Sequence, residues 1–87
     1  MNDVIFKYRL PLIKEPKVQM PDGAEVIHVG MQDDQITLWA KVDSNAEMET
    51  RNFAIAGTGR PDKRIRDAVH LGTVFDGGLV WHVFEID

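Results

Sequence analysis

The residues best suited to chemistry are concentrated in one short segment, Gly57 to Arg66. Its two glycines are separated by a threonine, and four cationic side chains follow within seven residues. Glycine-rich turns let backbone amides converge on an anion, and arginine adds paired contacts to a phosphate group. These residue types predict an anion-binding loop made of Gly57, Thr58, Gly59, Arg60, Lys63, Arg64 and Arg66.

This segment lacks the common nucleotide-binding motifs. The P-loop pattern GxxxxGK followed by Ser or Thr is absent. The dinucleotide pattern GxGxxG is incomplete, and no strand–helix–strand unit surrounds it. The alternative interpretation is a connecting loop, in which the glycines serve turns and the charges are solvated. The sequence leaves a binding site and a simple connector both open.

The basic character of the segment contrasts with the rest of the chain. The 87 residues have a formal net charge of −4, yet residues 51–66 contain five basic residues and one acidic residue. An acidic protein is not expected to bind nucleic acid or an anionic membrane non-specifically. We therefore expect a small anionic ligand, such as a nucleotide, and no direct contact with nucleic acid or a membrane.

One aromatic residue could complete such a site. Residues 36–42 alternate in polarity, so that Trp39 shares a face with Thr37 and Lys41, opposite the apolar face of the strand. An exposed tryptophan there could stack on a base or anchor a protein partner. Trp39 is therefore the eighth candidate ligand-binding residue, unless the sheet is covered on both sides and the ring is simply packed.

The remaining polar residues predict no catalytic centre. His28, His70 and His82 lack the spacing of metal ligands, there is no cysteine, and no nucleophile–histidine–acid pattern stands out. We expect no metal, no cofactor and no enzymatic activity. The acidic residues are predicted to form a solvated rim, with mimicry of nucleic acid or binding of a divalent cation as alternatives. They include Asp33, Asp34, Asp43, Glu47 and Glu49.

Length and composition indicate one domain over residues 1–87, with 44% hydrophobic residues. The absence of cysteine favours the cytoplasm, and the first residues do not form a signal-peptide pattern. No apolar stretch reaches the ~20 residues that span a bilayer. Because the core of so small a domain is modest, we expect a homo-oligomer.

The elements that must position the loop are strands, because apolar residues recur at every second position. Two hairpins are expected, one with a four-residue turn at 32–35 and one around Asp76-Gly77-Gly78. The last strand is apolar on both faces, which predicts a central position. Short helical turns are expected within 43–50 and 62–68. The fold class is thus a mainly β, small antiparallel β-sandwich or partly open barrel with one or two short helical turns. The predicted strands are 4–10, 17–20, 25–31, 36–42, 51–57, 71–75 and 79–86.

Four short sequence motifs occur together in this chain. They are MPDGA at 20–24, LWAKVD at 38–43, GTGRP at 57–61 and WHVFE at 81–85. Through these motifs the chain resembles a family of short uncharacterised proteins of tailed bacteriophages and prophages. The resemblance implies an accessory phage protein that acts in the host bacterial cytoplasm, and it implies no catalytic residues.

Small phage proteins without enzymatic motifs commonly act by binding, so the resemblance implies an anti-defence role. We expect the chain to sequester a phosphorylated small molecule, specifically a nucleotide signal. The loop from Gly57 to Arg66 would hold phosphate, and Trp39 would stack on the base. One alternative is a protein-binding inhibitor of a host defence protein, such as a CRISPR effector, that docks through an acidic face. Another is a structural accessory protein in which the loop only connects strands.

Overall fold

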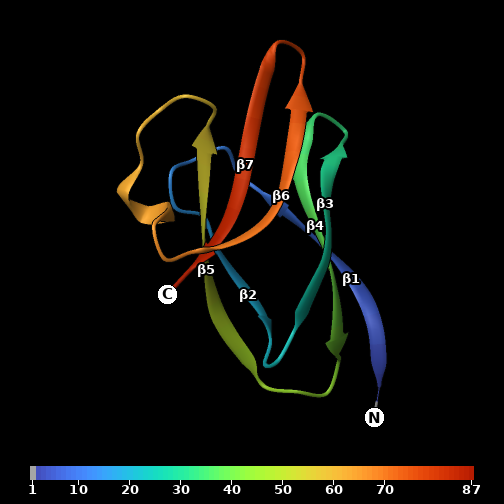
Figure 1. Cartoon of the computed structure of the whole chain (residues 1–87). Coiled ribbons are helices and arrows are strands. Elements are labelled where there is room, and N and C mark those ends of the chain that lie inside the picture. Colours follow the sequence, from blue (N-terminus) through green and yellow to red (C-terminus); the bar gives the residue numbers. More distant parts are fainter. Residues whose placement is uncertain (1) are drawn as a thin grey trace.

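Seven β-strands and a single 3₁₀ turn make up the described part of the chain, residues 2–87, in the computed structural model (Figure 1). All seven predicted strands are present, and several of them extend one to three residues beyond the predicted limits. The elements are β1 (Asp3–Leu10), β2 (Lys17–Pro21), β3 (Glu25–Gln32), β4 (Gln35–Asp43), β5 (Met48–Gly57), the 3₁₀ turn η1 (Lys63–Ile65), β6 (Val69–Asp76) and β7 (Leu79–Ile86).

The strands form two antiparallel sheets. One sheet has three strands in the order β1-β4-β3, and the other has four in the order β2-β5-β7-β6. The two sheets do not close into a barrel, which confirms the predicted mainly β class in its sandwich-like form. β7 lies between β5 and β6, in the central position that its two apolar faces predict.

The core lies between the sheets and is formed by alternate residues of the strands. In β4, Ile36, Leu38, Ala40 and Val42 are each at most 4% exposed, whereas Lys41 on the other face is exposed. Phe53 of β5 is fully buried between the sheets. Burying one face of each sheet supplies most of the stabilisation of such a fold.

The two sheets approach each other most closely along one side, where β3 lies against β6. Both strands carry a β-bulge there, between Val26 and His28 in β3 and between His70 and Gly72 in β6. A Cβ on Gly72 would be only 2.8 Å from the Cβ of Val29, so a side chain at Gly72 has no room. The opposite side, where β1 and β2 are the outer strands, has no such contact.

The connection between β3 and β4 is tighter than the predicted four-residue turn. Gln32 pairs with Gln35, so only Asp33 and Asp34 are left between the strands. Both have positive φ, 52° and 62°, which is the geometry of a two-residue type I′ turn. Aspartate tolerates this left-handed region better than most residues, which is why a turn without glycine can form here.

One of the two expected helical turns is present. The 3₁₀ turn lies within 62–68 as predicted, and the side chain of Asp62 accepts a hydrogen bond from the backbone N–H of Arg64. The segment after β4 is a plain turn instead, because Asp43 accepts bonds from the amides of Asn45 and Ala46, each at 3.0 Å. No helix within residues 2–87 is long and apolar enough to cross a membrane.

Candidate functional site

The candidate loop begins with a tight turn at the end of β5. The N–H of Arg60 donates to the carbonyl oxygen of Gly57 at 3.3 Å, which closes a four-residue turn. Gly59, the third residue of that turn, has φ of +79°. A positive φ at this position favours glycine because a Cβ would be strained there. The second glycine of the sequence therefore has a clear structural reason.

After this turn the chain folds back over the outer face of the four-stranded sheet (Figure 1). Ala54 and Ala56 point to that outer face, since Ile55 between them points into the core. Both alanines are nevertheless buried, at 0% and 5% exposure. Their small side chains leave room for the loop, whose Ile65 lines a hollow together with Ala56 and Phe84.

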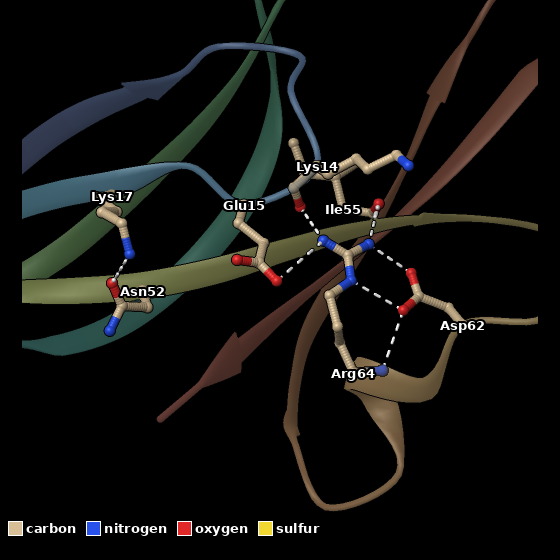
Figure 2. A network of polar contacts seen from close by, with 7 residues as sticks. All are labelled: Lys14, Glu15, Lys17, Asn52, Ile55, Asp62 and Arg64. Carbon is tan, nitrogen blue, oxygen red and sulfur yellow. Dashed lines mark hydrogen bonds and ion pairs between the residues drawn. The ribbon is translucent and has the colours of Figure 1, made fainter.

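Arg64 ties this loop to two other segments (Figure 2). Its guanidinium donates to both carboxylate oxygens of Asp62, with 2.8 Å between Nε and Oδ1. It also donates to the carbonyl oxygens of Lys14, in the β1–β2 connection, and of Ile55, the latter at 3.3 Å. Lys14 and Ile55 are themselves joined by a backbone hydrogen bond of 3.3 Å. Arg64 therefore holds three segments together, and its donors are engaged within the protein.

The ion pair shifts the titration of both partners. Hydrogen bonds from Arg64 are the largest cause that lowers the pKa of Asp62, from 3.8 to about 2. The same hydrogen bonds raise the pKa of Arg64. Both side chains are mostly buried, 15% and 21% exposed, so Asp62 stays ionised and Arg64 stays paired over the physiological pH range.

A groove of about 630 Å³ lies beside this pair, between the loop and the β1–β2 connection. Its floor contains Ile55 and Trp81, and its walls carry four cations from two segments of the chain. Besides Arg64, which pairs with Asp62, they are Lys14, Arg60 and Lys63. The fold thus brings Arg60 and Lys63 to the same groove and adds a lysine from 46 positions before Arg60 in the chain.

These three cations differ from Arg64 in lacking a carboxylate partner. None of the ion pairs within residues 2–87 involves Lys14, Arg60 or Lys63. Lys14 does contribute to the lowered pKa of Asp62 through its charge. In Figure 2 the carbonyl oxygen of Lys14 faces the guanidinium of Arg64, while the lysine side chain extends away from that guanidinium. The groove consequently has an excess of positive charge on an acidic protein.

Trp81 supplies the aromatic surface of the groove. It pairs with Gly57 across β5 and β7, and its Cζ3 atom is 3.5 Å from the position of a Cβ on Gly57. The Cδ atom of Arg60 is 3.4 Å from that same position, so the arginine stem and the indole ring both lie close to Gly57. The indole Nε1 of Trp81 is buried and has no hydrogen-bond partner among the described residues.

Trp39 lies elsewhere. It is on the outer face of the three-stranded sheet, with Thr37 and Lys41 as the alternation predicts, and it packs against His28 with 5.5 Å between ring centroids. No groove lined by the loop includes Trp39. The structure therefore does not bring Trp39 together with the other candidate residues, and Trp81 occupies the place beside them.

Thr58, Gly59 and Arg66 lie near the groove but do not line it. Thr58 and Gly59 line the adjoining hollow of about 340 Å³ on the outer face of the sheet. The Oγ1 of Thr58 is 2.7 Å from Nε2 of His82, and Nδ1 of the same ring is 3.0 Å from Oγ1 of Thr73. Arg66 is exposed and lines a separate hollow with Lys63. Of the eight candidates, the groove itself contains Gly57, Arg60, Lys63 and Arg64.

Other charged residues lie away from the loop. Arg51 pairs with Glu85 and donates to the carbonyl oxygen of Ala24 at 2.8 Å, so its charge does not add to the basic segment. The acidic residues are divided between the two ends of β4: Asp33 and Asp34 precede the strand, and Asp43 ends it. Asp33 and Asp34 therefore lie at the opposite end of the strand from Asp43.

Sequence reasoning missed Lys14 and Trp81. Lys14 follows Leu12 and Ile13 in a connection without any motif, and only its backbone pairing with Ile55 places it beside the loop. Trp81 reaches the groove because β7 pairs with β5. The aromatic residues of the last strand were a signal for Trp81. The sequence did not show, however, that this strand pairs with β5 as well as with β6.

Among the described residues, no three histidine or acidic side chains gather in a way that could hold a metal ion. Searches among curated proteins and among solved structures found no match. A family model, in contrast, matches the sequence over residues 1–87. The chain therefore belongs to the family described as a domain of unknown function, DUF7352.

Proposed function

We propose that this protein binds a phosphorylated small molecule in the groove beside the Gly57–Arg66 loop, without transforming it. The observation that carries the proposal is the convergence of Lys14, Arg60 and Lys63 on one groove without carboxylate partners. Charges of one sign in a concave surface focus the electric field and attract an oppositely charged ligand. A ligand with at least two phosphate charges matches three cations best.

The Arg64–Asp62 pair has a positioning role in this proposal. Because Arg64 joins the loop to Lys14 and Ile55, it fixes the spacing between the cations of the two segments. A site whose charges are held in place before binding loses less conformational freedom when the ligand arrives. Arg64 is therefore assigned to building the groove, and Arg60, Lys63 and Lys14 to contacting phosphate.

A nucleotide is the specific ligand class that we propose. The groove combines cations with the indole of Trp81, and an aromatic ring beside a phosphate site suits a base or a ribose. Trp81 takes the stacking role that the sequence suggested for Trp39. In the phage setting that the sequence resembles, binding would withdraw a signalling nucleotide from a defence system in the bacterial cytoplasm.

Isothermal titration calorimetry tests the proposal, with inorganic phosphate, pyrophosphate, and linear and cyclic nucleotides as probes. Replacing one contacting cation removes a charge-assisted bond of about 1.5–3 kcal/mol, so Arg60→Ala and Lys63→Ala should each weaken binding about tenfold or more. Lys41→Ala is the matched control, because Lys41 is an exposed lysine of the other sheet. No binding by the wild type, or equal binding by Arg60→Ala and Lys41→Ala, would sink the proposal.

The base contact has its own pair of variants. Trp81→Phe should weaken nucleotide binding and leave pyrophosphate binding nearly unchanged, because only the nucleotide uses the ring. Trp39→Phe should change neither, since Trp39 lies on the other sheet. Native mass spectrometry of protein purified gently from cells then identifies a co-purifying ligand by its mass.

The other functions expected from the sequence give different results in these experiments. A protein-binding inhibitor of a host defence protein would show no nucleotide affinity and a salt-sensitive capture of one host protein. A structural accessory protein would show neither. Of the acidic residues that the sequence singles out, Asp33 and Asp34 precede β4 and Asp43 ends it, so they do not all lie at one end of the fold. We favour the groove because three cations without a carboxylate partner among the described residues line it.

A further inference from the structure

The four outer strands of the two sheets are not equally protected against pairing with another chain. β3 and β6 lie against each other and both carry a bulge. β2 has only five residues, directly follows Pro16 and ends at Pro21. Short length, bulges, prolines and coverage are the usual devices that keep an outer strand from pairing. β1 is longer and unbulged, since its eight residues pair with β4 in one unbroken register, and its nearest proline, Pro11, comes only after the strand ends. Its own protection against pairing consists of the charged residues Asp3, Lys7 and Arg9.

β1 also exposes apolar side chains on both faces. Val4 and Phe6 lie on the side of the core, because they pair with Val42 and Ala40, yet they are 39% and 42% exposed. Ile5 on the outer face is 60% exposed. In Figure 1 the N-terminal end of β1 lies at the margin of the molecule, beside the end of β4. The N-terminal half of β1 is therefore an uncovered strand edge flanked by apolar side chains.

The charges of β1 are poorly matched within its own sheet. Asp3 lies directly opposite Asp43 on β4, a like-charge pairing that is unfavourable. Lys7 and Arg9 lie opposite Trp39 and Thr37, which carry no charge. Arg9 has one exposed contact, 3.4 Å from Asp33, of a kind that contributes little. Asp3 thus has no cation opposite it on β4, whereas the C-terminal half of β1 carries the two cations Lys7 and Arg9.

We propose that β1 pairs in antiparallel fashion with β1 of a second copy, forming a continuous six-stranded sheet across a two-fold axis at Phe6. In this register Asp3 lies opposite the partner's Arg9, and Val4 lies opposite the partner's Tyr8. The two-fold axis repeats both pairs on its other side. A two-fold interface repeats each contact, so both copies gain the same charge pair. The unpaired backbone groups of the strand edge find partners at the same time.

The charges also select this register among its neighbours. A two-fold axis at Lys7 would oppose two lysines and leave Asp3 without a partner. An axis at Ile5 would oppose Asp3 and the partner's Lys7 but pair only five residues of each strand. The axis at Phe6 pairs seven residues, from Asp3 to Arg9, and joins the apolar side chains of both copies.

Sedimentation over a dilution series tests whether the dimer exists, with Phe6→Lys as the disrupting variant. The wild type should sediment with twice the 9.9 kDa mass of one chain, and Phe6→Lys with the mass of one chain. Phe75→Lys is the matched control, since Phe75 is 72% exposed on β6, away from this edge. A wild type that is monomeric at every concentration, or a Phe75→Lys variant that dissociates equally, overturns the proposal.

Charge exchange and cross-linking test the register. Asp3→Arg alone and Arg9→Asp alone should both weaken the dimer by opposing like charges, and the double exchange should restore it. Because the chain has no cysteine, a single Phe6→Cys should oxidise to a disulfide-linked dimer more readily than Tyr8→Cys. Failure of the double exchange to restore association would assign the interface to another register. These results do not depend on ligand binding, because β1 does not line the groove.

Discussion

Arg64 and Asp62 form a closed unit in which one carboxylate oxygen accepts two hydrogen bonds from the same residue. The Oδ1 atom of Asp62 is 2.8 Å from Nε of Arg64 and 3.0 Å from its backbone nitrogen. The carboxylate thus starts the 3₁₀ turn and orients the guanidinium together. The Nη1 and Nη2 atoms of that guanidinium donate to the carbonyl oxygens of Lys14 and Ile55. One ion pair thereby connects the loop to β5 and to the β1–β2 connection.

Replacing Arg64 by methionine should destabilise the protein by about 2–3 kcal/mol, because it leaves a mostly buried carboxylate without its cation. Urea denaturation measures the change in the free energy of unfolding. Arg66→Met is the matched control, since Arg66 is exposed and makes no ion pair within residues 2–87. Its free energy of unfolding should stay within about 0.5 kcal/mol of the wild type. Equal effects of the two variants would contradict the role given to Arg64.

Acidification should remove the contribution of ionised Asp62 to the free energy of unfolding. Its pKa is lowered to about 2 in the folded protein from an ordinary 3.8, so the stabilisation is fully present above pH 3.8 and is lost as the pH falls through about 2. The shift corresponds to about 2 kcal/mol. The difference in unfolding free energy between the wild type and Asp62→Asn should therefore shrink over that range. A difference that stays constant with pH would refute this assignment.

The two glycines of the loop should respond differently to alanine. Gly59→Ala should cost about 1 kcal/mol, because φ of +79° strains any residue with a Cβ although the space around it is open. Gly57→Ala should cost almost nothing, since its new Cβ would make ordinary contacts at 3.4 and 3.5 Å. Thermal unfolding of both variants checks the contrast. A larger loss in Gly57→Ala than in Gly59→Ala would be inconsistent with this turn.

Gly72 should tolerate no side chain. Its Cβ would lie 2.8 Å from the Cβ of Val29, so Gly72→Ala must push β6 away from β3, at a cost of about 1–3 kcal/mol. Gly78→Ala is the control, because nothing lies within 4 Å of its Cβ position and its φ is not positive. Chemical denaturation of both variants measures the difference. A stable Gly72→Ala variant would show that the two sheets are not in close contact there.

Much of the fold follows from local patterns in the sequence. The alternation in residues 36–42 predicted which side of β4 faces the core, although Thr37 on the other side is buried as well. The apolar faces of residues 79–86 predicted a central strand. The turn at 32–35 was the least predictable local feature, since two aspartates in the left-handed region are less common than glycine. Alternation gives the face of a strand reliably because the side-chain period is two, whereas strand partners depend on the whole chain.

The sequence by itself determined the glycine turn, the cations of the loop and the core-facing side of β4, because these depend on residue type and on neighbours along the chain. Only the tertiary structure decided which cations are free. Arg51 and Arg64 are paired by Glu85 and Asp62, whereas Lys14 joins the groove from a distant connection. The pairing of β5 with β7 likewise placed Trp81 beside the loop and left Trp39 on the other sheet. Charge pairing and aromatic placement are set by distances between remote segments, and those distances exist only once the two sheets have packed.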